Sequence, residues 1–172
     1  MTQELMDLKT SILEGRYSDA LLIVDELEGM SKQAILRNIK AFLKILLIHL
    51  IKNQVEQRLT GSWACSIRNA VLEIQDLNLK GNKTSYYINN DEWDGFIESV
   101  LIGAIADASE EVLNGKLNRV QLAARIEQSP IILTAHRLLN LTYNYSEQEL
   151  PVIMDDYLSQ LPGGEDWSNR RN

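Results

Sequence analysis

Cysteine, proline, glycine and aromatic residues are all scarce in this chain of 172 residues. The single cysteine, Cys65, excludes an internal disulfide and a metal site built from several thiolates. Only three prolines and nine glycines interrupt the chain, and no alternating run of β-branched residues predicts a strand. Aromatic residues make up 6% of the sequence, so we expect a core of mainly aliphatic side chains. These scarcities favour helices.

Long apolar runs and a basic net charge are also missing. The most apolar window, residues 42–51, is broken by Lys44 and His49 and is far shorter than the roughly 20 residues that a membrane span needs. The first residues lack the basic flank and apolar stretch of a secretory signal. The net charge of −7 argues against general nucleic-acid binding, because phosphate recognition requires clustered Lys and Arg. We therefore expect a cytoplasmic protein without a membrane segment, whose partners are proteins, a second copy of itself included.

Apolar residues recur at helical spacing through most of the chain, which predicts an all-α fold. We expect a single domain at residues 1–162, built as a bundle of six to eight helices around a central apolar helix. After Pro162 the sequence turns polar, and we expect a mobile tail at residues 163–172.

Polar caps and glycines predict where the helices begin and end. The first helix is expected at Leu5–Leu13, and the second after Tyr17, ending near Gly29. Ser31 is the expected N-cap of the central third helix, which reaches about Arg58. Later starts and stops are expected at Ser62, at Asp91 or Asp94, at Gly115, at Asn118, at Ser129-Pro130 and at the capping box of Ser146 with Glu149. Trp63 is expected to be buried at the start of the fourth helix.

His49 is the first candidate for chemistry, because it lies on the apolar face of the third helix. We favour a structural role: a neutral ring that is hydrogen-bonded to a side chain, with Asp25, Glu28 or Arg68 as the candidate partner. Asp25 and Glu28 share one helix face, and a solvated acidic surface is their simplest interpretation. The alternative is an enzyme or small-ligand binder that uses His49 with Asp25 or Glu28 and with Arg68.

A basic stripe, defined as Arg37, Lys40, Lys44 and Lys52, follows one side of the third helix, within an arc of about 120°. Seven basic residues and one acidic residue lie between positions 32 and 68, so charge is strongly segregated along the chain. The stripe is a candidate partner-binding surface. Pairing with acidic residues of the second helix is the interpretation that we favour.

No motif in the sequence specifies a reaction. His49 and His136 lie far apart, and neither has the spacing of a zinc-binding pair. The segment Gly81–Ser85 lacks the glycines and the preceding strand of a phosphate-binding loop. We expect no metal and no cofactor. The sequence favours a non-enzymatic protein-interaction or regulatory module.

Several short segments occur in a characteristic order: Asp25–Glu28 is acidic, Leu46–Lys52 reads LLIHLIK, and Ser62-Trp63 is followed by Arg68. In this order they resemble the domain-of-unknown-function family 29, a group of small helical proteins best populated in cyanobacteria. Residues 93–114 resemble the family's penultimate helix, and residues 143–150 its closing segment. The resemblance implies an all-helical fold and leaves the function open.

Overall fold

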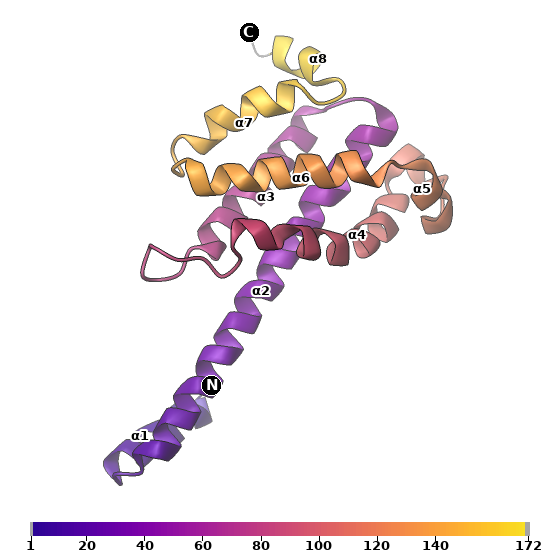
Figure 1. Ribbon diagram of the computed structural model, residues 1–172. Coiled ribbons are helices and arrows are strands. Elements are labelled where there is room, and N and C mark those ends of the chain that lie inside the picture. The colour runs from indigo at the N-terminus through magenta and orange to yellow at the C-terminus, as the bar shows by residue number, and fades with distance from the viewer. Residues whose placement is uncertain (1, 171–172) are drawn as a thin grey trace. The chain divides into compact units, whose positions relative to one another are not determined.

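The computed structural model describes residues 2–170, and helices dominate them (Figure 1). Among these residues there are eight α-helices, two short 3-10 helices and no strand, with one isolated bridge between Leu79 and Tyr86. The α-helices are α1 (Thr2–Leu13), α2 (Tyr17–Glu56), α3 (Gly61–Asn78), α4 (Trp93–Ser109), α5 (Arg119–Arg125), α6 (Gln128–Asn144), α7 (Leu150–Ser159) and α8 (Gly164–Asn169). The 3-10 helices are η1 (Asn90–Glu92) and η2 (Val112–Gly115). The all-α fold class is confirmed. None of the described helices combines the length and the apolar character that crossing a membrane requires.

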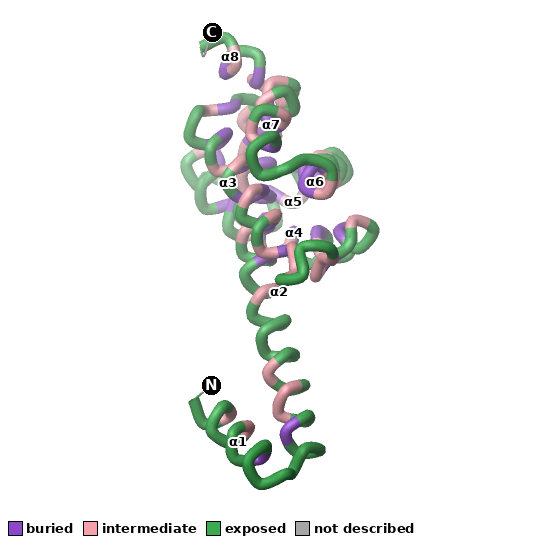
Figure 2. Tube along the Cα trace, turned by 90° about the vertical axis from the view of Figure 1, so that its left-hand side faces the viewer, coloured by how far each residue is buried: buried purple, intermediate pink, exposed green. Residues whose placement is uncertain are grey.

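The chain forms two compact units, Met1–Asn38 and Ile39–Asn172, and α2 contributes to both. The second unit holds most of the core. The part of α2 that belongs to it has buried residues on each of its turns from Ile39 to Asn53, as expected of a central apolar helix, and α3 packs on both α6 and α7. Its buried α2 side chains are those of Ile39, Leu43, Leu46, Leu47, Leu50, Ile51 and Asn53. Figure 2 shows where the buried residues of each unit lie.

The predicted break between a second and a third helix is wrong, because α2 runs without interruption through Gly29 and Ser31. A helix that ends at glycine usually needs that glycine in the left-handed conformation. Gly15, just after α1, adopts it with a φ of 73°, whereas Gly29 does not. A helical glycine costs only about 1 kcal/mol relative to alanine, and a 40-residue helix tolerates that cost.

Two predicted N-caps are also displaced. Thr60, rather than Ser62, caps α3, and its Oγ1 accepts a hydrogen bond from the backbone N–H of Trp63 at 3.0 Å. α6 begins at Gln128, so Ser129 lies within its first turn instead of capping it. Both predicted caps lie two residues after the observed ones. Thr60 has the same capping chemistry as Ser62, whereas Glu127, the N-cap residue of α6, makes no side-chain capping hydrogen bond.

Other predicted boundaries are confirmed. Asn118 caps α5 in a capping box with Gln121. Ser146 and Glu149 exchange hydrogen bonds ahead of α7, from the Ser146 N–H to Glu149 Oε2 at 3.1 Å and from the Glu149 N–H to Ser146 Oγ at 3.2 Å. The stop expected at Gly115 is wrong for the fifth predicted helix, because α4 ends at Ser109; Gly115 instead ends η2, with a φ of 74°.

The segment expected to be a polar tail contains α8, in which Trp167 is buried. At Gly163 and Gly164 the chain turns into this helix, and there it passes very close to the backbone of other segments. A Cβ on Gly163 would lie 2.7 Å from Arg58 Cα, and a Cβ on Gly164 would collide with the Leu158 carbonyl oxygen. Positions 171 and 172 of the expected tail lie outside the described residues.

Candidate functional site

The side chain of His49 is half-buried on α2, and its ring bonds to the backbone of its own helix. Nδ1 lies 2.8 Å from the carbonyl oxygen of Ile45. Because a carbonyl only accepts, Nδ1 carries the proton and Nε2 is the ring's acceptor. Burial lowers the pKa of His49 below its usual 6.5, outweighing the Ile45 hydrogen bond that raises it, and Lys52 lowers it further. His49 is therefore neutral near pH 7, and its partner is a carbonyl instead of the expected side chain.

The other members of the hypothetical catalytic set do not bond to His49. Arg68 forms an ion pair with Asp155 at 2.8 Å, which joins α3 to α7. Asp25 and Glu28 are exposed on the part of α2 that belongs to the first unit, whereas His49 belongs to the second. The structure thus gives Arg68 a partner of its own, and His49 a backbone carbonyl.

The basic stripe divides between the two units, and three of its members have partners within the second. Lys44 Nζ lies 2.7 Å from Asp107 on α4, and Lys52 Nζ lies 3.5 Å from Glu111 just beyond α4. Lys40 Nζ lies 5.5 Å from the centroid of the Phe96 ring, also on α4. Arg37 is exposed in the first unit. The lysines therefore pair internally, but with α4 and its C-terminal turn rather than with the second predicted helix.

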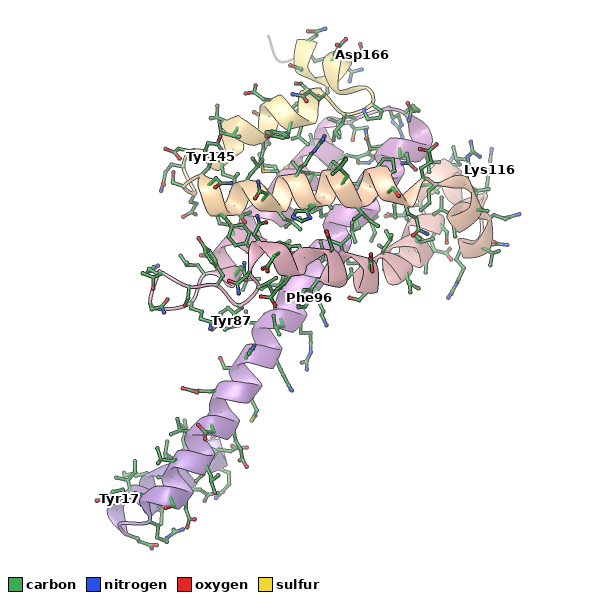
Figure 3. All side chains as sticks on the ribbon, viewed as in Figure 1. Tyr17, Tyr87, Phe96, Lys116, Tyr145 and Asp166 are labelled. Carbon is green, nitrogen blue, oxygen red and sulfur yellow. The ribbon has the colours of Figure 1, made fainter. Side chains whose placement is uncertain are left out.

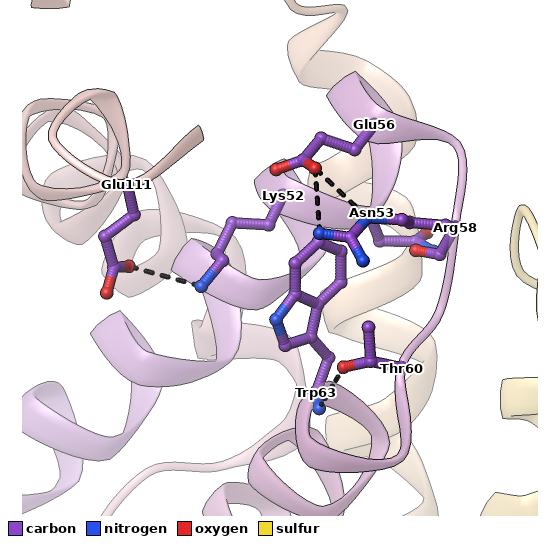
Figure 4. Close-up of polar contacts among 7 residues, drawn as sticks. All are labelled: Lys52, Asn53, Glu56, Arg58, Thr60, Trp63 and Glu111. Atoms are coloured by element: carbon purple, nitrogen blue, oxygen red, sulfur yellow. Dashed lines mark hydrogen bonds and ion pairs between the residues drawn. The ribbon is translucent and has the colours of Figure 1, made fainter. Parts of the chain in front are cut away.

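A cluster around Trp63 fixes the turn between α2 and α3 (Figure 4). Trp63 is buried, as predicted, and its ring centroid lies 5.0 Å from Lys52 Nζ and 4.7 Å from Arg58 Cζ. The Asn53 amide donates to the carbonyl oxygens of Arg58 at 3.0 Å and Pro162 at 2.8 Å. With Glu56, Thr60 and Glu111, these residues form what we call the Trp63 cluster. The contacts described for it are internal and link α2, α3 and the residues just beyond α4, although the Arg58 and Glu111 side chains remain more than half exposed.

Several large apolar side chains are exposed on the first unit. Of residues 2–38, only Ser11 and Ala20 are buried, and Figure 2 shows α1 mostly as exposed. On α1, Ile12 is 50% exposed and Leu13 is 76% exposed. A shallow hollow of about 240 Å³ runs along this face, lined by Leu5, Leu8, Lys9, Ile12 and Leu13. We call these five residues the α1 face. Further exposed apolar residues on α2 are Tyr17, Leu21, Leu22 and Met30.

The chain matches the model of a known family over most of the residues described above. The family described as Domain of unknown function DUF29 matches residues 9–113. The chain belongs to this family. The comparisons found no curated protein and no solved structure that matches this chain.

The DUF29 match includes α2, α3, α4 and the whole Trp63 cluster except Pro162, which only accepts from Asn53. It ends before α5, so α5 to α8 and the segment 143–150 lie beyond it. Among residues 2–170, no group of three or more His, Cys, Asp and Glu side chains is placed to hold a metal ion.

Proposed function

We propose that this protein is a non-enzymatic protein-interaction module, and that the α1 face is where its partner docks. The exposure of the α1 face supports this proposal. A helix of 12 residues is marginal in water by itself and gains its stability from packing its apolar side. In α1 the side chain buried within the unit is that of Ser11, while Leu5, Ile12 and Leu13 remain exposed. Contiguous exposed apolar surface of this kind marks an interaction site.

The hollow favours an amphipathic helix of the partner protein as the occupant. Leu5 and Ile12 are two helical turns apart on the same side of α1, a spacing that fits the ridges of an approaching helix. Lys9 is the single charged residue of the α1 face, and its ammonium group favours a partner with a carboxylate beside its apolar stripe.

A crosslinking experiment identifies the partner and tests the surface together. A photoactivatable residue at Met6, which is exposed beside the hollow, is expected to crosslink one partner in host cells. The same residue at Ile102, on α4 in the second unit, is expected to give no such product. The binding constant of the purified partner is then measured against two variants.

The matched variants are Leu13→Gln and Ile102→Gln, because both side chains are 76% exposed and neither change disturbs a core. Burial of a leucine on binding is worth about 1.5–3 kcal/mol, so Leu13→Gln should weaken binding about tenfold or more. Ile102→Gln should leave it unchanged. Equal affinity of both variants, or crosslinking from Ile102 alone, contradicts the proposal. If the isolated protein sediments as a dimer and Leu13→Gln dissociates that dimer, the occupant of the α1 face is a second copy of this chain instead of a partner helix, and the proposal is wrong on this point.

A further inference from the structure

A separate cavity of about 350 Å³ lies within the second unit, where α3 and α6 both end. Its wall consists of the last turns of α3 and α6, the loop that follows α3, and the first residues after α6. The side chains that carry the inference are those of Asp76, Lys83, Tyr86, Tyr143, Tyr145 and Glu147. None of this wall belongs to the α1 face, so the inference is independent of the proposed function, and the half contributed by residues 142–147 lies beyond the DUF29 match.

The charges around the cavity favour a cation. The C-terminal ends of helices carry partial negative charge, and α3 and α6 both present that end here. Neither helix has a basic residue in its last turn to offset it. Asp76 and Glu147 add two carboxylates, against the single ammonium group of Lys83.

Three tyrosine rings line the same cavity, and the face of such a ring attracts an organic cation. The Tyr86 and Tyr143 rings pack edge to face, with their centroids 4.7 Å apart. Tyr145 lies at the turn between α6 and α7 (Figure 3). A cation in this cavity would lie beside three tyrosine rings and two carboxylates, and both kinds of group attract positive charge.

Hydrogen bonds hold this wall in place before any ligand arrives. The Tyr143 hydroxyl donates to the Ile88 carbonyl at 2.6 Å and accepts from Trp93 Nε1 at 2.7 Å. The Gln75 amide donates to the carbonyl oxygens of Thr142 at 3.2 Å and Tyr145 at 2.9 Å. Binding therefore need not order the end of α6, and this preorganisation favours affinity.

We propose that this cavity binds an organic cation, an ammonium or guanidinium group, between the tyrosine rings and the carboxylates of Asp76 and Glu147. Two sources supply such a group: a free polyamine, or a Lys or Arg side chain of another protein. The chemistry of recognition is the same for both.

The test uses the full chain and a matched pair of small probes. Methylguanidinium and methylurea have nearly the same shape, but only the first is charged. Methylguanidinium is expected to shift the backbone NMR signals of Tyr86 and Tyr145 saturably, while methylurea does not. Spermidine and N-acetyl-arginine amide then distinguish the sources. Tighter binding of spermidine indicates a free polyamine, and tighter binding of N-acetyl-arginine amide indicates a protein side chain.

Exposed carboxylates provide the variants. The double change Asp76→Asn and Glu147→Gln is expected to weaken methylguanidinium binding about fivefold or more. The control, Glu73→Gln with Asp156→Asn, removes the same charge from exposed positions that do not line the cavity, and should leave binding unchanged. Circular dichroism verifies that both variants fold. Absence of saturable binding, equal binding of methylurea, or equal loss in the control variant would overturn the proposal.

Discussion

The hydroxyl of Tyr143 is the acceptor for a deeply buried donor, and its removal provides a sharp test of the fold. Trp93 is fully buried, and its Nε1 donates to the Tyr143 oxygen at 2.7 Å. The Asn78 amide donates to the same oxygen at 3.1 Å and also to the Ile88 carbonyl at 2.9 Å. Tyr143→Phe therefore leaves the Trp93 N–H without its acceptor, while Asn78 and Ile88 still bond to each other.

The expected loss of stability follows from these partners. An unsatisfied buried donor costs about 1–3 kcal/mol, and the weakened bonds of Asn78 and Ile88 add a smaller amount. Tyr143→Phe should lower the free energy of unfolding by about 2–4 kcal/mol. Urea denaturation followed by circular dichroism at pH 7 measures this loss. The control is Tyr145→Phe, at an exposed position two residues further on, which should cost less than about 0.5 kcal/mol. Equal midpoints for the two variants would refute the network.

Alkaline pH tests the same hydroxyl in the unmodified protein. Burial raises the pKa of Tyr143 to about 12 from the usual 10.0, and this outweighs the hydrogen bonds from Trp93 and Asn78 that lower it. A raised pKa in the folded state means that the neutral form stabilises the fold. This contribution is complete below pH 10 and is lost as the pH rises from about 10 to 12. Stability of the wild type should fall across this range more steeply than that of Tyr143→Phe. Parallel curves would show that the hydroxyl is not buried in the network.

Three further predictions concern two glycines, Gly164 and Gly29, and His49. Gly164→Ala should cost about 1–3 kcal/mol by clashing with the Leu158 carbonyl, whereas Gly81→Ala, with no atom near its added Cβ, should be nearly neutral in the same urea titration. Gly29→Ala should raise the helical content or the melting temperature, because alanine is favoured by about 1 kcal/mol inside a continuous helix; a loss of helix would restore the break at this position. The pKa of His49 is lowered in the folded state, so its stabilising contribution is present above pH 6.5 and declines as the pH falls below it. Stability measured from pH 7.5 to 5 should show this decline in the wild type and a smaller one in His49→Gln.

The elements of the fold follow from local sequence patterns, and the errors occur where local signals compete. Gly29 and Ser31 have the residue types of a helix end, but apolar residues continue at helical spacing on both sides of them. Residues 28–34 are exposed, so the break is not prevented by packing there; a helical glycine costs only about 1 kcal/mol, whereas a break would require a new and costly helix nucleus. Thr60 and Ser62 are equally good caps by chemistry, and the backbone conformation of the turn decides between them.

The candidate site depended on pairings that a sequence does not encode locally. Lys44 pairs with Asp107, more than sixty positions away along the chain, and only the packing of α4 against α2 brings them together. His49 has the carbonyl of Ile45 one turn earlier, a partner that every helical position offers. The exposed α1 face was missed because Leu5 and Ile12 have the spacing of core residues. Helical periodicity identifies an apolar face without saying whether the same chain covers it.

Residues that carry the resemblance to the DUF29 family make internal contacts, which points to a structural role for them. Lys52 and Trp63 belong to the segments that carry the resemblance, and both are committed to the turn between α2 and α3. The Lys52 side chain is only 13% exposed and lies beside Glu111, so a partner would have to break an internal pair to reach it. Such residues specify the scaffold. A protein that shares this scaffold can still differ in side chains that make no such internal contacts, and the two sites proposed above, the α1 face and the cavity where α3 and α6 end, are built from side chains outside the Trp63 cluster.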